Sequence, residues 1–224
     1  MVKELIAFVQ GELSARADPA KAGPMAAYMK TAMPFYGIPT PERREVARAL
    51  RRSYPPMTND EYRRQVLALW GLPHREEKYL AIGVAISNKE FIGKQNLDLY
   101  ERLIREGQWW DFVDGVAADL VGAVLASDRL EIAPVMMRWI DDPDMWIRRT
   151  AILSQIRHKA NTDERMLFDF CRRRANEKEF FIRKAIGWAL REYAKADPTA
   201  VRGFLASHGQ KLSGLSVREA AKHL

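Results

Sequence analysis

The amino-acid sequence predicts an all-α protein whose helices stack as an α-solenoid, a superhelix with a concave groove. Two observations predict this fold class. Helical periodicity of apolar residues fills the 224-residue chain, and no segment sustains the alternation of apolar and polar residues that marks a strand. In addition, a pattern of residues recurs at a fixed interval along the chain.

Short turns containing Pro, Gly or Asp separate the expected helices. Four helices start with a capping residue next to a proline or an acid, at Thr40-Pro41-Glu42, Thr58-Asn59-Asp60, Asp142-Pro143 and Asp197-Pro198. The expected helices cover residues 2–14, 23–33, 41–53, 59–70, 75–88, 95–106, 108–125, 129–140, 143–157, 162–175, 178–196, 198–208 and 215–224.

The recurring pattern has a period of 35 residues. An apolar residue followed by arginine occurs at this spacing three times, as Ile147-Arg148, Ile182-Arg183 and Val217-Arg218. A column with the same spacing is small or apolar throughout and comprises Val46, Ala81, Val116, Ala151, Ile186 and Ala221. A fixed period that carries a helix pair is typical of solenoids, in which each unit buries its apolar face only against its neighbours. We therefore expect one domain of HEAT-like repeats over residues 1–224.

Another column at this spacing is polar at nearly every position and is expected to face the open groove. It comprises Arg44, Tyr79, Asp114, Arg149, Lys184 and Glu219. Asp114 and Arg149 would then be lateral neighbours. Trp110 lies four residues before Asp114, and Trp188 lies four residues after Lys184, so both indoles could border the same strip. The sequence thus gathers Trp110, Asp114, Arg149, Lys184 and Trp188 into one neighbourhood.

An indole and a carboxylate aimed at one place form a site for a cationic group. Trp110 and Asp114 provide this combination within the segment WWDFVD, residues 109–114. Two simpler interpretations stay open: Trp110 as a core aromatic, and Asp114 as a mere ion-pair partner of Arg149. The other tryptophans outside this neighbourhood are assigned to packing, and they are Trp70, Trp109, Trp139 and Trp146.

Basic residues concentrate in the C-terminal third of the chain. Residues 145–224 carry 17 Lys and Arg against 8 Asp and Glu, a net charge of +9. Residues 1–144 carry the remaining 19 against 21, a net charge of −2. This asymmetry suggests a surface that faces a polyanion, although a solvated basic face without a partner explains the charge equally well.

The composition excludes several classes of protein. With 47% hydrophobic and 29% charged residues, the chain is expected to fold rather than stay disordered. The single Cys171 excludes an internal disulfide and a cysteine-clustered zinc site, and the four histidines lack metal-ligand spacing, so we expect no metal and no cofactor. Because a signal-peptide pattern and a long apolar run are both missing, we expect no membrane partner and a cytoplasmic location.

Six blocks of sequence, distributed over essentially the whole chain, carry a family resemblance. They read PMAAYMK (24–30), GIPTPERR (37–44), WWDFVD (109–114), WIRRTAIL (146–153), KEFFIRKAIGW with LREY (178–193) and SVREA (216–220). In this order and at this spacing, the blocks resemble the AlkD family of DNA glycosylases.

The resemblance implies a specific activity and specific residues. The family is built of HEAT-like repeats curved around duplex DNA, and it excises cationic N3- and N7-alkylated purines without flipping the base into a pocket. By motif, Asp114 corresponds to the catalytic carboxylate, and Trp110 and Trp188 correspond to the aromatics that contact the sugar of the damaged nucleotide. Arg149 corresponds to a DNA-contacting arginine, and Tyr28 matches a family position near the DNA.

These residues suit that chemistry. A cationic N3-methyladenine or N7-methylguanine leaves as a neutral base, so the enzyme needs no general acid but must stabilise the positive charge that develops on the sugar. Asp114 can do this electrostatically and orient a water. Lys184 and Arg183, with Arg149, would hold phosphates. We expect a monofunctional glycosylase of base excision repair, acting as a monomer near the nucleoid.

Two other functions are compatible with the repeats. A helical scaffold that binds proteins would explain the periodicity but not an indole and a carboxylate on one face. A relative that binds DNA without excision would be marked by loss of Asp114 or of one of its aromatics, and all of them are present.

Overall fold

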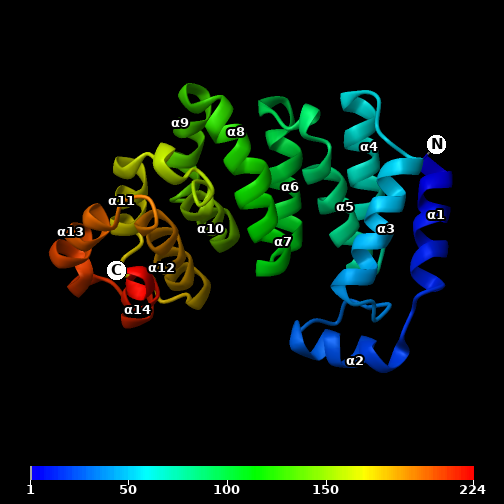
Figure 1. Ribbon diagram of the computed structural model, residues 1–224, viewed down its shortest axis with the longest axis horizontal. Coiled ribbons are helices and arrows are strands. Elements are labelled where there is room, and N and C mark those ends of the chain that lie inside the picture. Colours follow the sequence, from blue (N-terminus) through cyan, green and yellow to red (C-terminus); the bar gives the residue numbers. More distant parts are fainter. Residues whose placement is uncertain (1) are drawn as a thin grey trace. The chain divides into compact units, whose positions relative to one another are not determined.

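The computed structural model describes residues 2–224, and over these residues all regular secondary structure is helical (Figure 1). The predicted all-α, solenoid-like fold is thereby confirmed. The chain forms two compact units, the first ending at Ile92 and the second running from Gly93 to Leu224. Within the described residues, no helix is both long enough and apolar enough to cross a lipid bilayer.

The first unit consists of five α-helices and one short 3₁₀ turn. Helix α3 packs against α1 and α5, and α4 also packs against both, so that these four helices enclose the core of the unit (Figure 1). Leu5, Val46 and Leu69 are fully buried there. The bounds are α1 Val2–Ser14, α2 Pro19–Tyr28, α3 Thr40–Ser53, α4 Asn59–Trp70, α5 Arg75–Ser87 and the 3₁₀ turn Lys89–Phe91.

Helix α2 lies earlier in the sequence than predicted. The expected range was 23–33, whereas the helix covers Pro19–Tyr28. Asp18 accepts a hydrogen bond from the amide of Ala20 at 3.1 Å, and Pro19 supplies the preset first turn. The helix ends because Lys30 adopts a left-handed conformation, with φ of 50°. The prediction is wrong at both ends, because the helix starts at the Asp18-Pro19 signal and already ends before Lys30.

A buried carboxylate fixes the segment that leads from α2 to α3. Glu76, which is completely buried, accepts hydrogen bonds from the backbone amides of Tyr36 (3.1 Å), Gly37 (2.9 Å) and Ile38 (3.1 Å). Gly37 has φ of +87°, and a Cβ atom there would lie 2.1 Å from the carbonyl oxygen of Asp18. The turn therefore requires glycine, and Glu76 satisfies the amides that the turn leaves without partners.

Substitution of Glu76 by alanine is expected to lower the free energy of unfolding by about 3 kcal/mol, because the amides of Gly37 and Ile38, which are buried, and that of Tyr36, which is partly buried, lose their acceptor. Urea unfolding followed by circular dichroism measures this loss. Glu61→Ala is the matched control, since Glu61 accepts a single exposed amide hydrogen bond, from Met57. Equal losses for the two variants would contradict the role given to Glu76.

The second unit is also built of packed helices. Helix α10 packs against α6, α7, α9, α11 and α12, and α12 packs most extensively against α14. The bounds are 3₁₀ Lys94–Asn96, α6 Leu97–Gly107, α7 Trp110–Gly115, π-helix Val116–Val121, α8 Gly122–Ser127, α9 Arg129–Trp139, α10 Met145–Leu153, 3₁₀ Lys159–Asn161, α11 Glu164–Arg173, α12 Phe180–Ala194, α13 Pro198–His208, 3₁₀ Gly209–Lys211, α14 Gly214–Ala220 and 3₁₀ Ala221–His223.

Two of the four predicted helix starts have the expected side-chain cap. Thr58 accepts from the amide of Glu61, and Asp197 accepts from the amide of Ala200. Before α3, the N-cap position is Pro39, which has no side-chain acceptor. Before α10, the cap is Asp144 rather than Asp142; the Asp142 side chain instead accepts from the amide of Asp144.

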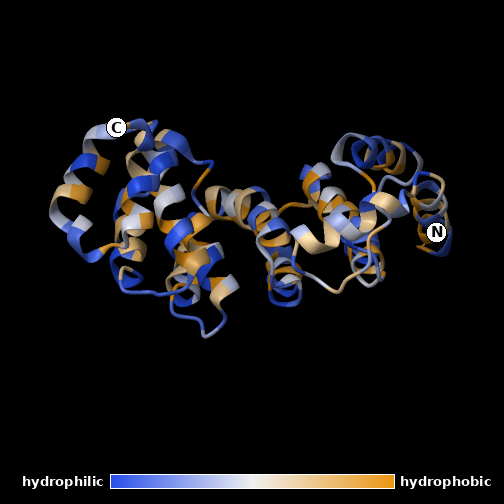
Figure 2. Ribbon diagram, turned by 90° about the horizontal axis from the view of Figure 1, so that it is seen from below, coloured by the Kyte–Doolittle hydropathy of each residue, from blue (hydrophilic) through white to orange (hydrophobic). Residues whose placement is uncertain are grey.

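The apolar column with the 35-residue period lies in the cores of the two units. Val46, Ala81, Val116, Ala151 and Ile186 are each no more than 1% exposed. Ala221, the last member, is exposed and lies in the 3₁₀ segment that follows α14. Figure 2 shows the resulting division of many helices into a hydrophobic and a hydrophilic side. The prediction is confirmed for five of the six positions.

Candidate functional site

The centre of the site is an ion pair between α7 and α10. Arg149 Nε donates to Asp114 Oδ1 at 2.8 Å, and Arg149 Nη2 donates to Asp114 Oδ2 at 2.9 Å. The two residues are 35 positions apart, so the lateral neighbours predicted from the repeat do touch. The side chain of Arg149 is only 5% exposed and that of Asp114 is 17% exposed. Arg149 therefore holds the carboxylate from inside, in a bidentate geometry.

An open pocket of about 260 Å³ lies beside this ion pair. Asp114, Gly115 and Ala118 line it from one helix, and Trp188 and Glu192 line it from α12. The structure thus brings Asp114 and Trp188 together at one surface of the second unit. Arg149 does not line the pocket, because its guanidinium lies behind Asp114.

The helix that carries Asp114 is interrupted by a π-helical segment. The sequence predicts one helix over 108–125, and the structure has α7, then Val116–Val121 as a π-helix, then α8. The π-helix begins two residues after Asp114, and Ala118 within it lines the pocket. Segments of this kind accommodate one extra residue in a helix and are frequent at functional sites.

Two carboxylates of the pocket have opposite electrostatic environments. Burial raises the pKa of Asp114, and the hydrogen bonds and charge of Arg149 offset only part of that rise. Burial also raises the pKa of Glu192, but Lys195, with smaller contributions from Arg191 and Trp188, outweighs it and leaves the pKa below its ordinary value. Glu192 is thus held ionised, while Asp114 takes up a proton more readily than an ordinary aspartate.

Aromatic side chains form the wall behind Arg149. The ring of Phe181 lies 5.4 Å from that of Trp109 and 4.9 Å from that of Trp146, centroid to centroid. Arg149 Nη1 donates to the carbonyl oxygen of Phe181, and its guanidinium carbon lies 5.8 Å from the centre of that ring. This cluster fixes the arginine, and through it the carboxylate of Asp114.

Trp110, the first residue of α7, is half-buried and does not line the pocket, although it shares a helix face with Asp114 one turn away. The predicted packing role of three tryptophans agrees with their burial, since Trp70, Trp139 and Trp146 are 3 to 6% exposed. Trp109, also expected to be a core residue, is only half-buried.

The expected phosphate-contacting residues differ in what they touch. Lys184 pairs with Glu219 at 3.0 Å, again 35 positions away, and its side chain remains 40% exposed. Arg183 donates to the backbone carbonyls of Glu177 and Lys178, so it secures the start of α12. Tyr28 lies in the first unit, at the end of α2, and is 74% exposed.

The sequence analysis does not identify two charged residues of the pocket, Glu192 and Arg157. Glu192 lies one turn after Trp188 on α12, and the nearby indole makes a small contribution to lowering its pKa. Arg157 lines the pocket and pairs with Asp119, with Nη2 2.9 Å from Oδ2. The Trp-x-x-x-Glu spacing was a usable signal for Glu192, whereas Arg157 lies after the end of α10 and outside the columns considered.

The fold and this pocket define a helical-repeat protein with an acid and an indole at one open site. The chain belongs to the DNA alkylation repair enzyme family, whose sequence model matches residues 9–224. Membership confirms the resemblance of the six sequence blocks and makes the protein an enzyme of DNA alkylation repair with a DNA substrate.

A solved structure supports the same assignment. The chain is similar to a predicted DNA alkylation repair enzyme from Enterococcus faecalis, with 29% sequence identity and a TM-score of 0.85. The match covers 93% of this chain and 97% of the other. No curated protein matched the chain.

Proposed function

We propose that this protein is a monofunctional DNA glycosylase that hydrolyses the N-glycosidic bond of cationic alkylated purines, N3-methyladenine and N7-methylguanine, in duplex DNA. The observation that carries the proposal is the shared pocket of Asp114 and Trp188, with the carboxylate fixed by Arg149. The family supplies the DNA substrate, and the pocket supplies a group suited to a cationic reaction centre.

The proposed reaction uses the positive charge that the lesion already carries. Cleavage of the bond between C1′ and the purine nitrogen releases a neutral base, and the bonding electrons leave with it. The sugar becomes cationic, and the Asp114 carboxylate stabilises that charge and orients the attacking water. Attack of the water on C1′ completes the hydrolysis, and its proton passes to solvent. The faces of Trp188 and Trp110 add a favourable interaction with the cationic sugar.

The surrounding residues are proposed to place the DNA. Lys184 and Arg183 would contact phosphates, Tyr28 would contact the duplex from the first unit, and Arg149 would act chiefly by holding Asp114. Because the pocket is open, the base need not leave the stack, and we propose excision without base flipping. The protein would act as a monomer in base excision repair, in the cytoplasm at the nucleoid.

Release of 7-methylguanine and 3-methyladenine from methylated duplex DNA tests this proposal. The native protein should release both bases and leave abasic sites without breaking the strand. A protein that binds the duplex but releases neither base would instead be a non-catalytic DNA binder, and one that binds no DNA would be a scaffold.

The pH dependence of excision is expected to report the raised pKa of Asp114. The ionised carboxylate is the active form, so kcat/KM should rise with pH through the pKa of the folded protein. The midpoint of this acidic limb should lie above the ordinary pKa of an aspartate. Steady-state excision between about pH 4 and 8 measures it. An acidic limb at or below the ordinary aspartate pKa would contradict the effect of burial.

Glu192 is expected to act as a positioning residue for Trp188. Glu192→Ala removes the side chain that lies beside the Trp188 indole in the pocket and should lower kcat/KM about fivefold to tenfold, whereas Glu192→Gln keeps the shape and a side-chain oxygen and should stay near native. Lys195→Met is the control, because it removes a partner of Glu192 and leaves the Glu192 side chain in place. If the glutamine variant fails as badly as the alanine variant, charge rather than indole orientation explains the effect.

A further inference from the structure

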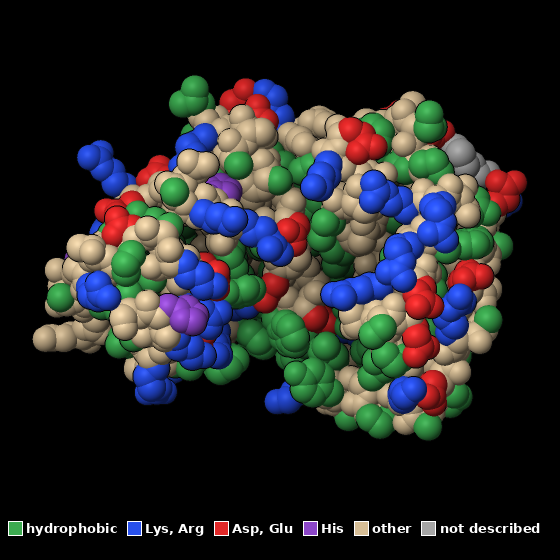
Figure 3. Space-filling view, in the orientation of Figure 1, with side chains coloured by type: hydrophobic (Ala, Val, Ile, Leu, Met, Phe, Trp, Pro, Cys, Tyr) green, Lys and Arg blue, Asp and Glu red, His purple; other side chains and the backbone are tan. Residues whose placement is uncertain are grey.

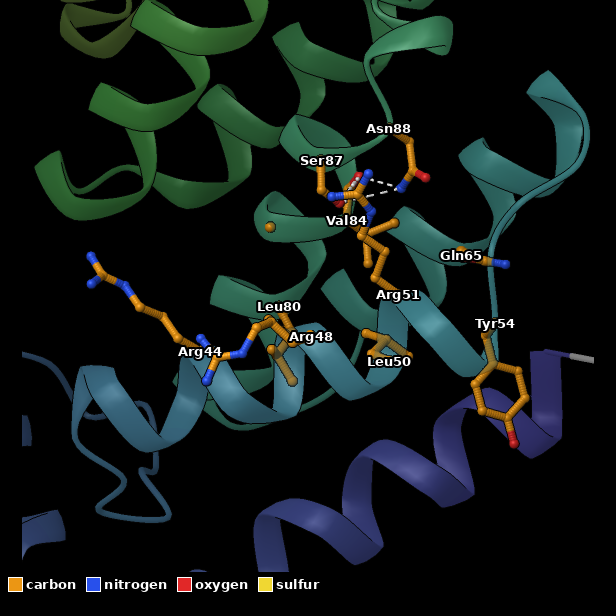
Figure 4. A pocket seen from close by; sticks show the side chains of 12 residues that line it. Arg44, Arg48, Leu50, Arg51, Tyr54, Gln65, Leu80, Val84, Ser87 and Asn88 are labelled. Atoms are coloured by element: carbon orange, nitrogen blue, oxygen red, sulfur yellow. Dashed lines mark hydrogen bonds between the residues drawn. The ribbon is translucent and has the colours of Figure 1, made fainter.

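A second pocket, of about 250 Å³, lies entirely within the first unit, between α3 and α5 (Figure 4). Three arginines of α3 border it: Arg44, Arg48 and Arg51. Their spacing of four and three residues places them on one face of the helix. Figure 3 shows Lys and Arg side chains following one another over this part of the first unit.

The three arginines are exposed, and within residues 2–224 none of them has an ion pair or a hydrogen bond with another side chain. Other arginines of the chain, such as Arg105, Arg148 and Arg149, pair with carboxylates. Three uncompensated guanidinium groups on one helix produce a positive potential around the pocket, and Figure 4 shows their side chains spread along its edge, with Arg44 and Arg51 pointing in different directions. They supply several donors in the fork geometry that matches phosphate oxygens.

The opposite wall of the pocket offers buried amide groups. Asn88 is 6% exposed, and its amide nitrogen donates to the carbonyl oxygen of Val84 at 2.8 Å. Gln65 is 3% exposed, and its amide nitrogen has no hydrogen-bond partner among residues 2–224. A buried donor without an acceptor costs free energy, and a ligand with polar edge atoms would remove that cost.

The interior between these walls is apolar. Ala47 of α3 and Leu80 and Val84 of α5 provide hydrocarbon surface, and Tyr54 closes one end (Figure 4). A volume of about 250 Å³ is near the lower end of ligand pockets, which span roughly 300–1,000 Å³. Such a pocket suits one small ligand with a flat apolar body, a polar edge and a phosphate.

The repeat relates this pocket to the candidate active site. Arg44 and Arg48 stand two periods of 35 residues before Asp114 and Ala118, which line the pocket of the second unit. The same columns therefore line both pockets, but an arginine replaces the aspartate. The exchange of a carboxylate for a guanidinium changes the preferred ligand from a cation to an anion.

We propose that the pocket of the first unit binds a nucleoside phosphate monoester. Its phosphate contacts Arg48, with Arg44 and Arg51 of the same helix adding to the positive potential. Its base lies on Ala47, Leu80 and Val84, and the polar edge of the base meets Gln65 and Asn88. The same chemical group occurs in free mononucleotides and at the 5′-phosphorylated end of a DNA strand. This site goes beyond the proposed excision reaction and does not depend on it.

Isothermal titration of the full chain with adenosine monophosphate tests the proposal. We expect saturable binding of one molecule per chain, with adenosine alone and inorganic phosphate each weaker by about tenfold or more. Arg48→Gln should weaken nucleotide binding about tenfold. Arg52→Gln is the matched control, because it removes the same charge from α3 at a position that does not line the pocket, and it should leave binding unchanged.

Two otherwise identical oligonucleotides, with and without a 5′-phosphate, distinguish the sources. If the protein binds the phosphorylated oligonucleotide more tightly, and Arg48→Gln abolishes this difference, the site binds strand ends. If the protein binds both oligonucleotides with equal affinity, the site binds free nucleotides. The proposal is overturned if adenosine monophosphate does not bind saturably, if phosphate binds as tightly as the nucleotide, or if Arg52→Gln weakens binding as much as Arg48→Gln.

Discussion

Asp114→Asn is expected to lower the rate of 7-methylguanine release from duplex DNA by about 10²–10³-fold, because a preorganised charge at a developing cation contributes roughly 3–4 kcal/mol. The carboxylate is held by two hydrogen bonds from Arg149 at the edge of the pocket. Asparagine keeps the shape and one acceptor oxygen but not the negative charge. Single-turnover release of the base, measured by chromatography, gives the rate.

Asp111→Asn is the matched control for this variant. Asp111 lies three residues earlier on α7 and does not line the pocket, so the same loss of charge should change the rate by less than about threefold. Thermal unfolding of both variants checks that the fold is intact. An Asp114→Asn protein that is folded and excises at the native rate would remove Asp114 from the mechanism.

Arg149→Ala is expected to lower the free energy of unfolding by about 3–5 kcal/mol, since it leaves the buried carboxylate of Asp114 without its partner. The loss depends on pH in a defined direction. Without Arg149 the pKa of Asp114 rises further, and a raised carboxyl pKa contributes stability at low pH that is lost as pH rises through that value. The variant should therefore be more destabilised at pH 8 than at pH 5, relative to the native protein.

Urea unfolding at both pH values measures this difference. Arg157→Ala serves as the control, because Arg157 pairs with Asp119 but its side chain is 62% exposed, and its removal should cost less than about 1 kcal/mol. A pH-independent loss in Arg149→Ala would show that packing on Phe181, and not the charge of Asp114, is what Arg149 contributes.

The periodic part of the structure could be predicted from the sequence. The 35-residue columns identified the buried positions and the lateral pairs, and the Asp114–Arg149 and Lys184–Glu219 contacts have that separation. The 35-residue spacing predicts these contacts because equivalent residues of stacked helix pairs lie side by side. The proximity of Asp114 and Trp188 followed from the same alignment of columns.

Local departures from the period could not be predicted. Helix α2 belongs to no column. Its start depends on the Asp18 cap, and the segment after it is held by hydrogen bonds to Glu76, a residue about 40 positions later in the chain. The burial of Arg149 depends on the aromatic wall around Phe181. Arg148 and Arg183 both follow an isoleucine at equivalent positions of the repeat, and both donate to backbone carbonyls. Arg148 also pairs with the carboxylate of Glu177, a contact that its equivalent position does not predict.

The π-helix at Val116–Val121 makes the orientation of Asp114 sensitive to the length of the chain. One residue corresponds to a rotation of about 100° around a helix axis. The π-helix takes up one extra residue within a turn, so the face of Asp114 keeps its direction relative to the residues that follow. The same extra residue wound as an ordinary α-helix would rotate Asp114 by that angle and turn it away from Arg149, while every side chain of the pocket remained in the sequence. The scaffold could then persist without the reaction, so the π-turn is what ties the length of this helix to the placement of the carboxylate.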